Sequence, residues 1–223
     1  MQGERGVGRK PRQTQGWDTN TKDRLLNAAF KEFDEKGYYL TNGDTITKRA
    51  GLGHGTFYNY FKSKNEVLIE LLRRSTNAIP YMAYRNDPRY LMRHAGSPDQ
   101  FEAVLMEMVN PLSEIPGLLK ALFQGMLQDQ EIIAFGMRIG RDLARMFRVI
   151  IRERQKEGGL KGCDVRILPE IMAVCLSTSI LLTAARIIAC SPEVLIHNLC
   201  AMLTPVLFPD NQDGKTSPPM PVR

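Results

Sequence analysis

A short stretch around residue 58 carries side chains suited to reading another molecule through hydrogen bonds. Phe57 and Phe61 lie four positions apart, so in a helix they share one face and can pack inward. Tyr58 and Asn59 then face outward. The residues with hydrogen-bonding tips are Thr56, Tyr58, Asn59 and Tyr60, followed by the positively charged Lys62 and Lys64. The alternative is an amphipathic helix whose tyrosine-rich face contacts only solvent.

Two short predicted helices joined by glycines position this stretch. Residues 45–50 form the first, with Asp44 predicted to cap it, and residues 54–60 form the second. Gly51 and Gly53 break the chain between them, because glycine adopts the backbone angles of a tight turn. Two helices joined by such a turn form a helix-turn-helix, whose second helix enters the major groove of DNA.

The same stretch resembles the recognition segment of the TetR-type transcriptional regulators. The matching residues are Ala50-Gly51-Leu52, Gly55-Thr56-Phe57-Tyr58, Tyr60-Phe61 and Ser63-Lys64, within the family pattern A-G-V-S-x-G-T-F-Y-x-Y-F-x-S-K. The sequence departs from that pattern at Gly43, Thr45, Thr47 and Gly53. The resemblance implies an all-α fold, with an N-terminal three-helix DNA-binding domain of the helix-turn-helix type and a larger helical ligand-binding and dimerisation domain. It further implies a repressor that binds a palindromic operator in double-stranded DNA as a homodimer and is released by a hydrophobic small molecule.

The resemblance also implies which residues contact DNA. The candidates for base edges are His54, Gly55, Tyr58 and Asn59, those for phosphate are Thr41, Thr56, Tyr60 and Lys64, and Asn42 and Lys62 complete the set. Thr41 and Asn42 have a second interpretation as caps of the helix that follows them.

The distribution of charge fits a DNA-binding N-terminal segment. The whole chain of 223 residues has a net charge of +6. Residues 1–64 contain twelve Lys or Arg against seven Asp or Glu, a net of +5, so the remainder is almost neutral. A phosphate backbone attracts such a segment.

The chain divides into four predicted segments. These are a disordered basic arm (1–17), the helix-turn-helix domain (18–64), the ligand-binding and dimerisation domain (65–208) and a disordered tail (209–223). The arm, with Arg9, Lys10 and Arg12, either lies in a minor groove or remains a solvated tail. It lacks the apolar core of a signal peptide, and we expect a cytoplasmic protein.

Apolar periodicity predicts the remaining helices. The first covers Thr19 to Lys36, is capped by Asn20 or Thr21 and is ended by Gly37. The next begins at Lys64 and is kinked or ended at Pro80. Two helices follow from Pro98, broken around residues 111–116, and one more covers residues 130–157. The last carries an arginine stripe, from Arg138 to Arg152, that we interpret as a solvated face.

Two apolar helices are predicted at the end of the chain. Only fifteen uncharged residues separate Glu170 from Arg186 within residues 167–189, which is too few to span a bilayer. The helix of residues 167–189 is apolar nearly all round and must therefore be covered on every side. Residues 191–207 form a second helix, which carries an apolar stripe. The pair predicts a four-helix interface between two copies of the chain, and no membrane contact.

Methionines suggest an adaptable apolar site for an effector, although methionine in helical cores is usually simple packing. The predicted ligand-binding residues are Met82, Met106, Met126, Phe135, Met137 and Met146.

The sequence favours neither catalysis nor a cofactor. The four cysteines lack metal-ligand spacing and are predicted to be buried free thiols, and three histidines give no metal-ligand cluster. We find no nucleophile, acid and base in an arrangement that indicates an enzyme. Two alternatives stay open: a carrier of apolar ligands that no longer binds DNA, and an enzyme with an unrecognised site.

Overall fold

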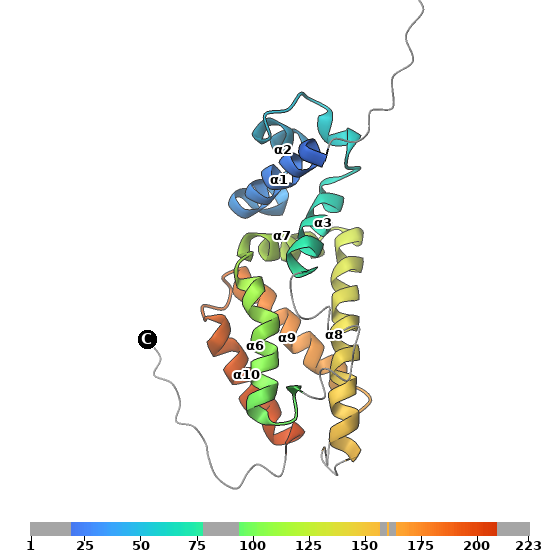
Figure 1. Ribbon diagram of the computed structural model, residues 1–223, viewed down its shortest axis with the longest axis vertical. Helices are drawn as coiled ribbons and strands as arrows, with labels where there is room; N and C mark the ends of the chain where they lie inside the picture. The colour runs from blue at the N-terminus through green and yellow to red at the C-terminus, as the bar shows by residue number, and fades with distance from the viewer. Residues whose placement is uncertain (1–18, 78–93, 157–159, 161–163, 209–223) are drawn as a thin grey trace, which may run out of the picture.

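The computed structural model describes residues 19–77, 94–156, 160 and 164–208. Every regular element in these residues is a helix, as the sequence predicts. Figure 1 shows a small head of α1 and α2 at one end of the long axis and a larger helical body at the other. The predicted arm (1–17) and tail (209–223) lie outside the described residues, as do Pro80, Met82 and Cys163.

The head consists of α1 (Thr19–Leu40), α2 (Gly43–Arg49) and the 3₁₀-helix η1 (Thr56–Asn59). Leu25, Ala29 and Phe33 of α1 are completely buried, which confirms the predicted apolar stripe. Gly37 interrupts the regular helix with a φ of 73° and a ψ of −172°, so the predicted stop is real, although helical residues resume after it. Asn20 and Thr21 lie inside α1 rather than at a cap.

Two details of the predicted helix-turn-helix are wrong. Asn42, and not Asp44, caps α2: its side chain accepts a hydrogen bond from the Thr45 backbone N–H, and the Thr45 side chain accepts one from the Asn42 backbone. The second helix is also shorter than the predicted range of residues 54–60. The turn continues to Gly55, which adopts a φ of 85°, and η1 begins only after it.

The body contains α6 (Pro98–Ser113), α8 (Gln130–Lys156), α9 (Leu168–Ala184) and α10 (Pro192–Leu207). Their buried residues form one core, with Phe101 and Phe147 among the largest completely covered side chains. The arginines of α8 at positions 138, 141, 145 and 152 are exposed, which supports their interpretation as a solvated face.

The two terminal helices are less covered than predicted. The helix α9 ends at Ala184, and Arg186 beyond it has a φ of 59°. Ile171 and Val174 of α9 remain exposed within one chain, and so does Cys175, which corrects the prediction of a buried thiol there. No helix among the described residues has the length and apolar content needed to cross a membrane.

Two helices join the head to the body: α3 (Lys64–Asn77) and α7 (Pro116–Met126). Val67 and Leu68 of α3 and Leu118 of α7 belong to the same buried cluster as the core of α1. The core of the head therefore extends past Lys64, and the boundary predicted there stays a prediction.

The packing of α7 on α1 is the most extensive contact between any two described helices. The two helices are close at Gly117, where an added Cβ would lie 2.1 Å from the Asp34 Oδ1 atom and 2.4 Å from the Asp34 Cα atom. Gln124, further along α7, accepts a hydrogen bond from the Tyr38 backbone N–H at 2.8 Å. Glycine thus lets two backbones touch where any side chain would separate them.

We expect Gly117→Ala to lower the free energy of unfolding by about 1–3 kcal/mol, because the methyl group meets the Asp34 Cα atom as well as the Asp34 carboxylate, and the backbone atom cannot rotate away. The matched control is Gly140→Ala on α8, where an added Cβ has nothing within 4 Å. That control should be neutral or stabilising by up to about 1 kcal/mol. Urea unfolding at one fixed protein concentration measures both, and equal effects would contradict the close packing described here.

Candidate nucleic-acid interface

The 3₁₀-helix η1 presents a polar face to solvent and is held by two buried phenylalanines. Phe57 and Phe61 are only 1% and 3% exposed, as their spacing predicts. Tyr58 is 64% exposed, and its ring meets the edge of Phe57 with 5.3 Å between centroids. Asn59 and Lys62 are also exposed. The aromatic contact holds the Tyr58 ring, and its hydroxyl lies near Gly43 of α2, 3.2 Å from where a Cβ would be.

Other predicted base contacts lie beside η1. The His54 side chain is exposed, and its Nδ1 lies 3.5 Å from a carboxylate oxygen of Asp44. Gly55 precedes η1, and Thr56 and Tyr60 are half-buried. His54, Tyr58, Asn59 and Lys62 are thus exposed in or beside η1, and Gly55 is half-buried at its start.

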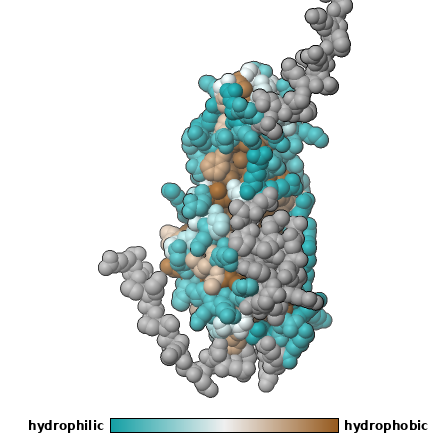
Figure 2. Space-filling model, viewed as in Figure 1, coloured by the Kyte–Doolittle hydropathy of each residue, from teal (hydrophilic) through white to brown (hydrophobic). Residues whose placement is uncertain are grey.

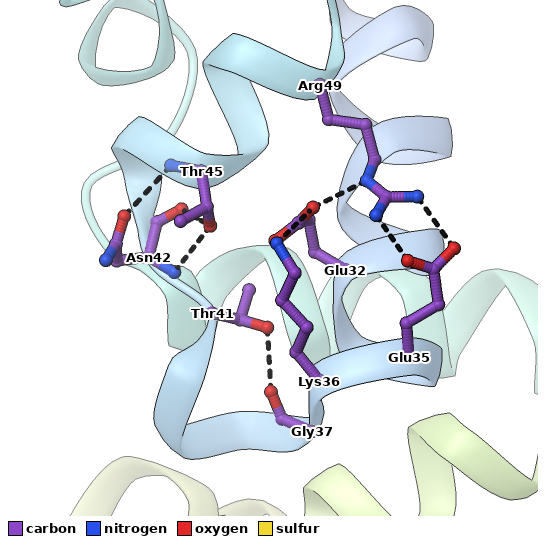
Figure 3. Close-up of polar contacts among 8 residues, drawn as sticks. All are labelled: Glu32, Glu35, Lys36, Gly37, Thr41, Asn42, Thr45 and Arg49. Carbon is purple, nitrogen blue, oxygen red and sulfur yellow. Dashed lines mark hydrogen bonds and ion pairs between the residues drawn. The ribbon is translucent and has the colours of Figure 1, made fainter.

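The helix α2 is held against η1 by close packing and by its cap. A Cβ at Gly43 would lie 2.9 Å from the Phe57 ring, so glycine is required where the sequence departs from the family pattern. Figure 3 shows the reciprocal hydrogen bonds of Asn42 and Thr45 at the start of α2. The Asn42 amide nitrogen has no part in this cap and remains exposed with the rest of the side chain.

A group of four charged residues binds α2 to α1 (Figure 3). The Arg49 guanidinium donates to Glu32 at 2.5 Å and to Glu35, while Lys36 donates to Glu32 at 2.8 Å. Burial raises the pKa of the Glu32 carboxyl, but the hydrogen bonds from Lys36 and Arg49 outweigh burial and lower it. The Arg49 charge is therefore engaged inside the head and is not offered to a phosphate.

Two predicted phosphate contacts are engaged elsewhere. Thr41 is completely buried and its hydroxyl donates to the Gly37 carbonyl at 2.7 Å, so this hydroxyl does not reach DNA. The Lys64 ammonium donates to the Tyr38 carbonyl at 2.7 Å and lies 3.9 Å from the centre of the Tyr38 ring. Burial lowers the pKa of Lys64, although Asp129 nearby opposes this. Lys64 secures the head to the body.

Lys64 borders a polar network that the sequence analysis missed. The Tyr38 hydroxyl donates to Asn65 at 2.7 Å and lies 3.3 Å from Asp129, and the Asn65 amide donates to Asp129 at 2.8 Å. Burial and the Asp129 charge raise the pKa of Tyr38 to about 12. No local pattern could reveal this network, since its partners are as far as 91 positions apart.

The predicted ligand-binding residues do not form one site. Met137 is exposed, Met146 is buried in the core of the body, and Met106 packs beside that core. Met126 and Phe135 belong with the core of the head, and Met82 lies outside the described residues. A helical methionine pattern shows that a residue is apolar but not which neighbour it meets, and here packing is its role.

The described part of the chain contains no group of three His, Cys, Asp or Glu side chains able to hold a metal ion.

The head, made of α1, α2 and the exposed 3₁₀-helix η1, has the arrangement of a helix-turn-helix, and it is joined to a helical body. Residues 25–71 match the family model described as bacterial regulatory proteins, tetR family. The uncharacterized HTH-type transcriptional regulator YhgD of Bacillus subtilis (strain 168) is 26% identical over 156 residues, which are 68% of this chain and 78% of that protein. Over residues 25–71 the chain is therefore similar to the TetR family of transcriptional regulators.

Solved structures share the fold. A TetR-family transcriptional regulator from Syntrophomonas wolfei str. Goettingen has a TM-score of 0.65 at 19% identity, over 84% of this chain and 95% of that one. The transcriptional regulator FadR from Bacillus subtilis, in complex with stearoyl-CoA, has a TM-score of 0.59 at 18% identity, over 82% and 97% of the two chains.

We expect Lys62→Ala to weaken binding to DNA of any sequence and to reduce the slope of log affinity against log salt by about one unit. Lys62 is exposed beside η1, unlike the engaged Lys64. Lys120→Ala, an exposed lysine of α7, is the control and should leave the slope unchanged. Salt titrations of DNA binding by fluorescence anisotropy measure both, and equal slopes for all three proteins would exclude a phosphate contact by Lys62.

Proposed function

We propose that this protein is a TetR-family repressor that binds a palindromic operator as a homodimer and is released by a hydrophobic effector. Each head places η1 in the major groove of one half-site, and the two half-sites lie about 34 Å apart, one turn of DNA. His54, Gly55, Tyr58 and Asn59 face base edges, while Asn42, Thr56, Tyr60 and Lys62 face the phosphates and groove walls.

The DNA-binding pose is supported above all by the difference in solvent exposure between neighbouring residues of η1. Phe57 is buried while its neighbour Tyr58 is 64% exposed, and both positions are held by the same ring contact. Exposure of the apolar part of a large aromatic side chain to water is unfavourable. In a DNA groove, a rigidly held side chain of this kind makes apolar contacts with its ring and hydrogen bonds with its hydroxyl group.

Dimerisation is supported by apolar surface on the two terminal helices. Val174 of α9 is 61% exposed and Met202 of α10 is 69% exposed, with Ile171 nearby on α9. Figure 2 shows apolar residues interrupting the hydrophilic surface along the edge of the body where α10 lies in Figure 1. Apolar faces of this kind on adjacent helices suit a two-fold four-helix interface.

A hydrophobic effector is supported by the apolar interior of the body and by a structural relative whose crystal form contains stearoyl-CoA. That relative shares the fold at 18% identity, so its ligand does not determine the chemical class of effector for this chain. Release requires the effector to bind the DNA-free arrangement of the heads more tightly than the DNA-bound one.

The operator can be obtained by sequencing the genomic fragments that the purified protein retains. On that operator we expect Tyr58→Ala to weaken binding at least about tenfold, since a lost base contact costs about 1–3 kcal/mol. Binding to unrelated DNA should change little. Leu127→Ala removes an equally exposed side chain at the end of α7 and serves as the control. Unchanged operator affinity for Tyr58→Ala would reject the pose.

We expect Met202→Glu to convert the dimer to a monomer and to abolish tight operator binding, because two carboxylates would enter an apolar interface. Met137→Glu makes the same change at an exposed methionine of α8 and should leave the dimer intact. Sedimentation velocity gives the masses. A dimeric Met202→Glu variant would place the interface elsewhere.

A further inference from the structure

We infer that the effector site is the apolar pocket between α6, α7, α9 and α10, and that it takes a compact lipophilic molecule about the size of one aromatic ring. This inference rests on the proposed function and gives the site and the chemical class of its effector. The six wall residues on which the argument depends are Leu112, Leu119, Ile180, Thr183, Ala184 and Leu195.

The walls of the pocket are almost entirely apolar, although four separate helices contribute to them. Ala184 and Ile180 of α9 face Leu119 of α7 and Leu112 of α6, and Leu195 of α10 completes the enclosure. These six residues are half-buried or buried, whereas Ser113 and Pro116 in the same lining are exposed, so the pocket is an apolar hollow that is partly open to solvent. A gap with apolar walls favours an apolar occupant over water.

The volume limits the size of the ligand. The pocket measures about 180 Å³. A dry apolar protein cavity of about 150 Å³ is large enough to bind benzene. A single substituted ring therefore fits, whereas a long acyl chain does not fit without movement of the helices.

Two hydroxyl groups at the pocket allow at most a modest polar substituent. The Ser113 hydroxyl donates to the Asn110 carbonyl at 2.5 Å and is engaged. The Thr183 hydroxyl lies 3.9 Å from the Cys190 sulfur, a weak contact that a ligand hydroxyl could replace. A toluene-like or phenol-like molecule matches these walls.

The position of α7 connects this pocket to the head. Pro116 and Leu119 of α7 line the pocket, while Gly117 of the same turn touches the α1 backbone at Asp34. Since the Asp34 Cα atom and carboxylate leave no free space at Gly117, a displacement of α7 by the ligand must move α1 or break the contact. Gln124 extends the connection through its hydrogen bond to Tyr38.

A second pocket at the junction of α1, α3 and α8 is a weaker candidate. It measures about 250 Å³, and both acidic and basic side chains line it, among them Lys22, Glu70 and Arg138. Such walls suit water and ions, and they do not fit a hydrophobic effector.

The first experiment measures binding without DNA. We expect benzene, toluene and phenol to raise the Tm of the full-length protein by about 3–8 °C at saturation. Ala184→Phe attaches a phenyl ring to the pocket wall and should remove this rise. Ala103→Phe makes the same change at an exposed position of α6 and should keep it. If Ala184→Phe does not unfold cooperatively, Leu112→Phe fills the pocket from α6.

The second experiment measures operator affinity with the same proteins. We expect toluene to weaken operator binding by the wild type and by Ala103→Phe about tenfold or more. Ala184→Phe, with its built-in ring, should bind the operator weakly even without ligand and should not respond to toluene. Stearoyl-CoA is tested in parallel as the large-ligand comparison.

Different outcomes overturn different parts of the inference. No rise in Tm with any of the three aromatic compounds, or an equal rise in Ala184→Phe, excludes the pocket as their site. A rise in Tm with unchanged operator affinity excludes the connection through α7. A response to stearoyl-CoA alone, equal in wild type and Ala184→Phe, places the effector elsewhere. Failure to bind any specific DNA without ligand rejects the proposed function, while the Tm measurements still test the pocket.

Discussion

The close contact between α1 and α7 is the constraint on which the rest of the structure depends. At Gly117 the two backbones leave no room for a Cβ, so the head cannot slide on the body without losing the contact. The buried cluster of the head includes Leu118 and Leu122 from α7. This helix therefore belongs to both parts of the molecule, and head and body form one mechanical unit through it.

Much of the positive charge of the head serves its own structure. Arg49 neutralises two carboxylates of α1, and Lys64 lies on the ring and carbonyl of Tyr38. The number of Lys and Arg residues in the head is therefore larger than the number of cations available to contact a phosphate backbone. The surface of η1 relies on fewer, exposed cations such as Lys62, and on hydrogen-bonding tips held by buried aromatic rings.

The sequence predicts features that depend on local periodicity, and it fails where distant residues meet. The spacing of Phe57 and Phe61 correctly predicts which face of η1 is buried. The length of η1 depends on the backbone angle of Gly55, which its identity permits but does not dictate. The network of Tyr38, Asn65 and Asp129 joins α1, α3 and the residue that precedes α8, so no window of sequence contains it. The methionines predicted to bind a ligand lie in different parts of the described structure, because composition does not fix which residues converge in space.

The length of α3 has a geometric consequence for the distance between two heads. This helix begins at Lys64, separated from η1 by residues 60–63, and its fourteen residues span about 21 Å at 1.5 Å per residue. In the proposed homodimer, a tilt of this helix by about 10° displaces the head by nearly 4 Å. Successive base pairs are separated by about 3.4 Å, so in that assembly such a rotation shifts a head by about one base pair.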